Sequence, residues 1–183
     1  MLLLREKSLL LIVDMQERIL PAMNDSQGAI DRCLQLLGAA RTLSIPILVS
    51  EQYPHGLGPT VSALRESAQG TPVFTKLHFS CAADPDIAAK VREFLASGRT
   101  QLVLAGIEAH VCVLQSALGF KEMGFDCFVA TDATTSRARA SIVVANDRLR
   151  SSGISLITTE MAVFEWLHTA GTPEFKYLSN LLK

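Results

Sequence analysis

The stretch TQLVLAGIEAHVCVLQSALGFKE, residues 100–122, joins an apolar segment to an amphipathic one. It predicts a strand at Thr100–Ala105 and a helix at Val111–Glu122, so that Cys112 lies where the helix begins. The dipole and free N–H groups of a helix N-terminus favour a thiolate and can stabilise an oxyanion beside the sulfur. The stretch therefore predicts a strand-to-helix turn that carries a candidate nucleophile for acyl transfer. A buried, unreactive cysteine is the common alternative.

The rest of the chain repeats this alternation of strand and helix. Further strands are predicted at Ser8–Val13, Pro46–Val49, Pro72–Thr75, Phe125–Ala130 and Ser155–Thr158. Helices are predicted at Ser26–Leu43, Thr60–Ala68, Asp84–Ala96, Arg137–Ser151, Glu160–Leu167 and Pro173–Leu182. Turn-forming residues predict irregular structure at Glu51–Pro59 and a strand end at Thr131–Ala133. The pattern predicts an α/β fold: a three-layer α-β-α sandwich around a six-stranded parallel, Rossmann-like sheet. With 183 residues and no linker, we expect one domain over residues 1–183.

Two charged residues occupy unusual places at the ends of predicted strands. Asp14 ends the run Leu9–Val13, and Lys76 closes the run Pro72–Thr75. In an open parallel sheet the carboxyl ends of the strands meet at one edge, where ligands bind. We therefore expect Asp14, Lys76 and Cys112 to converge there as an acid, a cation and a nucleophile. Taken singly, Asp14 could cap the following helix and Lys76 could be a solvated strand end.

The composition narrows the range of partners and locations. Hydrophobic residues make up 49% of the chain and charged residues 19%, which fits a covered parallel sheet and a homo-oligomer, a dimer or larger. The net charge is −1 with no basic cluster, so we expect no nucleic-acid or membrane partner. The cysteines fit no zinc or disulfide pattern. Reduced thiols and the lack of a signal-peptide pattern at the start lead us to expect a cytoplasmic protein.

Three motifs resemble a known family. They are Asp14 in LLLIVDMQ, Lys76 in FTKLHFS and Cys112 in GIEAHVCVLQSAL. Together they resemble the Asp-Lys-Cys triad of the isochorismatase-like cysteine hydrolases, which include nicotinamidases and N-carbamoylsarcosine amidase. The resemblance runs from about Ser8 to Thr158. The stretches EQYPHGLGPTV, GIEAHVCV and TDATTSR look most like the isochorismatase domain-containing protein branch.

The resemblance implies a mechanism. Asp14 would take the proton of Cys112, and Lys76 would favour the charged state of both. The thiolate would attack the carbonyl carbon of a small molecule and break its C–N (amide-like) bond. The resulting thioester would then be hydrolysed by water. The peptide bond Ile107–Glu108 would be cis. The backbone N–H groups of Glu108 and Cys112 would form the oxyanion hole.

The chain departs from the nicotinamidase pattern at residues 50–55. Nicotinamidases carry an Asp-x-His and a further histidine that bind a metal, whereas this stretch reads SEQYPH and contains one histidine. Metal ligation needs several ligands of suitable type and spacing. We therefore expect no metal and no cofactor, and nicotinamide is in doubt as the substrate.

Several residues just beyond the strand ends are expected to line the substrate pocket: Gln16, Gln52, Tyr53 and Phe79. For each, simple loop packing is an equal alternative. His110 is expected to have a pocket or capping role rather than to act as the base.

Two other functions stay open. One is a catalytically silent small-molecule-binding or thiol redox protein on the same fold. The other is a water-using vinyl-ether hydrolase, as in true isochorismatases, which typically lack the cysteine.

Overall fold

Six parallel strands form one sheet in the computed structural model, which describes residues 1–183. The strands are β1 (Ser8–Val13), β2 (Ile47–Gln52), β3 (Val73–Lys76), β4 (Gln101–Ile107), β5 (Asp126–Thr135) and β6 (Ser155–Ile157). Their order across the sheet is β3-β2-β1-β4-β5-β6, and every neighbouring pair is parallel. The order reverses at β1 and β4, so their carboxyl ends flank the crevice where parallel sheets bind ligands.

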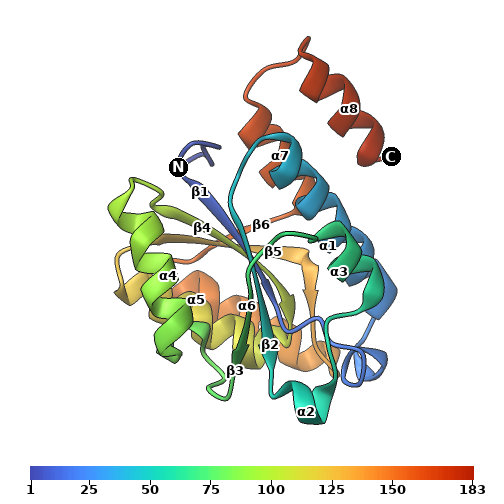
Figure 1. Cartoon of the computed structure of the whole chain (residues 1–183), viewed down its shortest axis with the longest axis vertical. Helices are drawn as coiled ribbons and strands as arrows, with labels where there is room; N and C mark the ends of the chain where they lie inside the picture. Colours follow the sequence, from blue (N-terminus) through green and yellow to red (C-terminus); the bar gives the residue numbers. More distant parts are fainter.

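Helices cover both faces of the sheet, which confirms the predicted three-layer sandwich (Figure 1). One face carries α4 (Pro85–Ala96), α5 (Leu114–Glu122) and α6 (Arg139–Ser151). The other face carries α1 (Ser26–Thr42), α3 (Ser62–Ser67), α7 (Thr159–Leu167) and α8 (Pro173–Leu181). The short helix α2 (Pro54–Leu57) lies beyond the end of β2. None of these helices is both long and apolar enough to cross a bilayer.

Strand β1 is apolar from Leu9 to Val13 because it lies in the middle of a sheet that is covered on both faces. Leu10 and Ile12 pack into the core beneath α1, while Leu9, Leu11 and Val13 pack into the core on the other face. Side chains alternate between faces along a strand, and both faces are covered here. All of these residues are fully buried, so the first polar position, Asp14, falls where the strand leaves the sheet.

Gly106 sets the distance between the ends of β1 and β4. Its φ of +115° lies in a region that favours glycine. A Cβ atom at this position would lie 2.1 Å from the carbonyl oxygen of Val13. The two strand ends can therefore approach closely only because residue 106 has no side chain. This approach brings Asp14, one residue after Val13, near the segment that carries Cys112.

Several element boundaries differ from the sequence predictions. Strand β5 continues to Thr135, because a register shift opposite Leu104 and Gly106 lets it pair again with the end of β4. The predicted strand end at Thr131–Ala133 is therefore wrong. The predicted irregular segment contains α2, which opens at Pro54.

The predicted helix starts near the site also change. The α-helix α5 begins at Leu114 and is preceded by a π-helical turn, Ala109–Val113, which carries Cys112. Helix α6 begins at Arg139 rather than Arg137, because the backbone N–H and side chain of Arg137 both bond to Glu108.

Candidate functional site

Asp14 and Lys76 meet although their strands are not neighbours. Strand β2 lies between β1 and β3, yet Lys76 Nζ reaches to 2.7 Å from Asp14 Oδ2. Both side chains are buried, with exposed fractions of 0% for Lys76 and 4% for Asp14. From β2, Ser50 Oγ donates to Asp14 Oδ1 at 2.8 Å, and the Ser50 carbonyl accepts from the Asp14 N–H. Ser50, which the sequence did not single out, therefore holds the carboxylate in place.

The ammonium group of Lys76 is fully occupied by protein acceptors. It donates to Asp14 Oδ2 at 2.7 Å, to Gln52 Oε1 at 2.8 Å and to the Phe79 carbonyl at 3.3 Å. A lysine has three N–H donors, so none remains. Burial alone would lower the pKa of Lys76, but Asp14 and the thiols of Cys81 and Cys112 raise it above the ordinary value.

Cys112 completes the group from the π-helical turn after β4. Its side chain is almost buried, and it lines the same cavity as Asp14. Burial raises the pKa of the Cys112 thiol, Asp14 raises it further, and Lys76 opposes the change. The thiol is therefore protonated at neutral pH. A helix N-terminus lowers the pKa of a thiol, but here desolvation and the adjacent carboxylate raise it by more.

A cavity of about 100 Å³ opens onto Cys112 and Asp14. Its walls are mostly apolar and consist of Ile19, Leu57, Phe79, Ile107 and Val111. Gln52 and Glu108 are the other polar residues that line it. Nucleophile, carboxylate and a small apolar cavity therefore share one place at the carboxyl edge of the sheet.

The pocket residues expected from the sequence divide into two groups. Gln52 and Phe79 line the cavity. Gln16 does not, because its buried amide bonds to the Gln52 backbone on both sides and to the Gly58 carbonyl, which fixes the loop after β2. Tyr53 is half exposed and lines a separate surface hollow. His110 lies beside Ser136, with Nδ1 2.9 Å from Oγ, and faces a groove along α6.

Strand β4 is followed by a cis peptide bond, Ile107–Glu108, which the resemblance implied. The N–H of Glu108 donates to no protein acceptor, so it is available to a ligand. The Glu108 carboxylate is turned to Arg137, with Oε2 3.2 Å from the Arg137 backbone nitrogen and 3.1 Å from Nε. The side chain of Glu108 therefore brings no unbalanced charge to the site.

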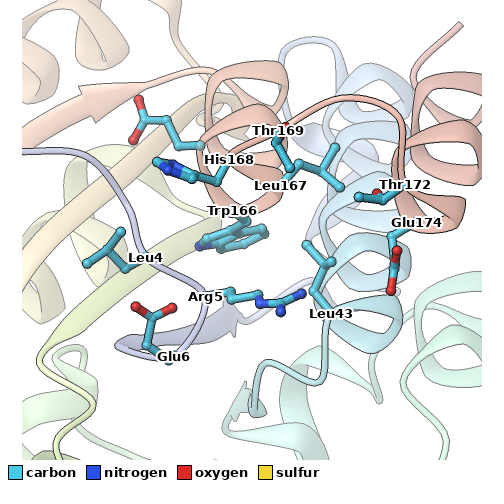
Figure 2. Close-up of a pocket in the computed structure, with 11 residues that line it drawn as sticks. Leu4, Arg5, Glu6, Leu43, Trp166, Leu167, His168, Thr169, Thr172 and Glu174 are labelled. Atoms are coloured by element: carbon cyan, nitrogen blue, oxygen red, sulfur yellow. The ribbon is translucent and has the colours of Figure 1, made fainter.

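A larger cavity of about 450 Å³ lies at the opposite edge of the sheet (Figure 2). It is enclosed by the segment before β1, the end of α1 and the connection from α7 to α8. Trp166 forms part of its wall, and its indole N–H already donates to Ser8. This cavity contains no cysteine and lies at the amino ends of the strands, away from the edge where parallel sheets bind ligands. No three His, Cys, Asp or Glu side chains anywhere in the chain are grouped to hold a metal ion.

The buried thiols predict a loss of stability in alkali. Burial raises the pKa of Cys81 to about 11 and that of Cys127 to about 12, and also raises those of Cys33 and Cys112. An unfolded thiol titrates near pH 8.5, so above that pH the unfolded chain releases protons that the folded chain keeps. The free energy of unfolding should therefore be highest below about pH 8.5. Above that pH it should fall by about 1.4 kcal/mol per pH unit for each thiol as the pH rises toward 11.

Urea unfolding at pH 8, 9 and 10 under reducing conditions measures this slope. Cys127→Ala should remove about a quarter of it, because one of the four thiols that contribute is lost. A free energy of unfolding that stays constant from pH 8 to 10 would contradict the raised thiol pKa values.

Comparisons with known proteins find relatives over nearly the whole chain. The chain is 36% identical to isochorismatase domain-containing protein 2A of Mus musculus, over 99% of this chain and 85% of that protein. Among solved structures it is similar to a Caenorhabditis elegans protein described as MAR1 ribonuclease, with a TM-score of 0.92 and 33% identity over 100% of this chain and 92% of that one. It is also similar to an Escherichia coli protein described as an octameric hydrolase of unknown specificity, with a TM-score of 0.90 and 25% identity over 98% and 90% of the two chains.

The model of one family covers most of the chain. The isochorismatase domain matches residues 8–161, from the start of β1 into α7, and so includes Asp14, Lys76 and Cys112. With its hydrolase fold, this chain belongs to the isochorismatase family.

Proposed function

We propose that the chain is a metal-independent cysteine hydrolase that cleaves the C–N (amide-like) bond of a small molecule through a thioester on Cys112. One observation carries this proposal. The Asp14 carboxylate, 2.7 Å from the Lys76 ammonium, lines one small cavity together with Cys112. A base beside a nucleophile, and itself held by a third group, is the arrangement that nucleophilic catalysis needs.

Acylation begins with transfer of the thiol proton to Asp14 as the sulfur attacks the substrate carbonyl carbon. The carbonyl oxygen becomes an oxyanion, which accepts hydrogen bonds from the backbone N–H groups of Glu108 and Cys112. When the intermediate collapses, the C–N bond breaks and Asp14 returns the proton to the leaving nitrogen. An amine and an acyl thioester on Cys112 result. The raised pKa of the thiol suits this scheme, because the proton leaves only when Asp14 takes it.

Deacylation uses the same groups with water. Asp14 accepts a proton from water as the water oxygen attacks the thioester carbonyl, and the oxyanion hole again holds the negative charge. Collapse expels the Cys112 sulfur, which regains its proton from Asp14. Lys76 stays bound to Asp14 throughout and balances the charge that moves between carboxylate and sulfur.

A small molecule fits this site better than RNA. The similar C. elegans protein is described as a ribonuclease, which makes RNA a competing substrate for this chain. Binding of a phosphate backbone draws on Lys and Arg, whereas this chain has 17 of them against 18 Asp and Glu. The cavity at Cys112 has a volume of about 100 Å³, which is too small for a nucleotide.

We further propose that the chain forms a homo-oligomer. The similar E. coli protein is described as octameric. On this chain, the neighbouring Val143 and Val144 of α6 leave 55% and 60% of their surface exposed, which makes this helix a candidate for the contact between subunits. Sedimentation velocity should therefore detect a species larger than 19.8 kDa; a single monomeric species would contradict self-association.

The covalent intermediate provides the test of the proposed chemistry. The protein is mixed with the small activated ester cyanomethyl acetate, quenched in acid and digested, and each cysteine peptide is examined by mass spectrometry. We expect an acetyl group on Cys112 that hydroxylamine removes, and none on Cys127, which is also buried but lies on β5. Hydrolysis of amides without acylation of Cys112 would overturn the thioester route. Oxidised Cys112 together with no hydrolysis would favour the thiol redox alternative.

A further inference from the structure

The cavity at Cys112 limits the size of what can react there. Its volume of about 100 Å³ is smaller than the engineered cavity of about 150 Å³, lined by similar apolar side chains, that holds benzene. In proportion to the six carbons of benzene, the cavity has room for about four non-hydrogen atoms. A six-membered ring is therefore too large, while an acyl group such as propionyl fits.

The charges around the cavity are all balanced within the protein. Asp14 is paired with Lys76, and Glu108 is paired with Arg137 at 3.1 Å. Lys76 has donated all of its N–H groups to Asp14, Gln52 and Phe79. No Lys or Arg is among the residues that line the cavity. A carboxylate on the substrate would thus enter an apolar space with two carboxylates at its edge and no free cation, which is strongly unfavourable.

The remaining walls favour an aliphatic chain. Ile19 comes from the loop after β1 and Leu57 from α2, and Ile107 and Val111 flank the nucleophile. Phe79 contributes an aromatic face, but more than half of its surface is exposed, which places it at the mouth. These side chains offer no hydrogen-bond partner. The polar side chains that line the cavity are engaged within the protein: Gln52 with Lys76 and the Leu77 carbonyl, and Glu108 with Arg137. The walls therefore favour a ligand that is apolar apart from its reacting amide.

We infer that the site takes a short, uncharged aliphatic amide whose acyl group has about four non-hydrogen atoms. That the ligand is cleaved at an amide bond rests on the proposed function. That the ligand is short, uncharged and aliphatic rests on the cavity alone. It excludes aromatic amides and amides with a carboxylate in the acyl group. Longer aliphatic amides should be poor substrates, because the cavity has no room for additional methylene groups.

The size limit is tested by kcat/KM for a series of primary amides. Propionamide should be preferred to hexanamide and to benzamide by about 100-fold or more, since even one methylene group changes kcat/KM by about 10- to 200-fold in a hydrophobic pocket. Oxamate, which is close to propionamide in size but carries a carboxylate, should not be hydrolysed. Equal rates for benzamide or oxamate and for propionamide would overturn the inference.

A variant with an enlarged cavity tests whether these walls set the limit. Ile19→Ala should raise the ratio of kcat/KM for hexanamide to that for propionamide by about tenfold or more. Ile30→Ala is the matched control, because Ile30 is also partly buried against the same core but does not line the cavity. If both variants change the ratio equally, the cavity does not determine chain length.

Alkylation separates failure of this inference from failure of the proposed function. Iodoacetamide and iodoacetate differ in charge, and neither requires turnover. For each reagent, the rate of Cys112 alkylation is divided by the rate at which the same reagent alkylates glutathione, which corrects for their different intrinsic reactivities. We expect this normalised rate to be at least tenfold higher for iodoacetamide than for iodoacetate. If it does while no amide is hydrolysed, the proposed hydrolysis is wrong and the inferred ligand class stands. Equal normalised rates would overturn the ligand class even if amides are hydrolysed.

Discussion

Replacement of Cys112 by alanine is expected to reduce amide hydrolysis by at least about 10⁴-fold, because no other group at the cavity can form the acyl intermediate. Asp14 and Lys76 remain in place in this variant, so any residual rate measures what the oxyanion hole and binding achieve with water alone. The change removes one sulfur from a nearly buried position and should cost about 1 to 2 kcal/mol of stability. The kcat/KM for propionamide and the urea midpoint measure both effects.

Cys127→Ala is the matched control for this prediction. Cys127 is also buried and belongs to the same core cluster as Cys112, but it lies on β5 away from Asp14. We expect its activity to remain within about twofold of the wild type, with a similar loss of stability. Near-wild-type hydrolysis by Cys112→Ala would show that water attacks directly, as in the vinyl-ether hydrolases that lack the cysteine.

The convergence of Asp14, Lys76 and Cys112 could be predicted because it depends on topology. Each follows or ends a strand, and parallel strands place their carboxyl ends at one edge. The fully apolar run of β1 likewise reveals a central strand with both faces covered. Such features depend on residue spacing, which the sequence displays directly.

Gln52 and Phe79 were predicted to line the pocket, but Ile19 and Leu57 were not, because they come from the connections after β1 and β2. Ile19 and Leu57 are positioned by the left-handed backbone of Tyr53 and by the hydrogen bonds of buried Gln16 to Gln52 and Gly58. Those contacts join segments about forty residues apart and leave no periodic signal. The state of the Cys112 thiol was also misjudged. A helix terminus is visible in a sequence, whereas the desolvation that outweighs it depends on tertiary packing.

Removal of the charge on Lys76 should impair both folding and catalysis. Lys76→Met leaves the Asp14 carboxylate buried without its counterion, which should lower the free energy of unfolding by about 3–5 kcal/mol. Lys90→Met is the control, because Lys90 forms an ion pair of similar length, 2.6 Å from Glu93, at the surface. That change should cost less than about 1 kcal/mol. Urea unfolding at pH 7 measures both.

The double variant Asp14→Asn, Lys76→Met separates the structural role of this pair from its chemical role. With both charges gone, no unpaired ion remains buried, so much of the stability lost in Lys76→Met should return. Hydrolysis should not recover, because a side-chain amide in place of the Asp14 carboxylate cannot accept the thiol proton; Asp14→Asn alone should lower kcat/KM by about 10²–10⁴-fold. Stability losses that simply add would mean that the two charges are not coupled in the folded protein. Recovery of activity along with stability would mean that Asp14 orders the site without acting as its base.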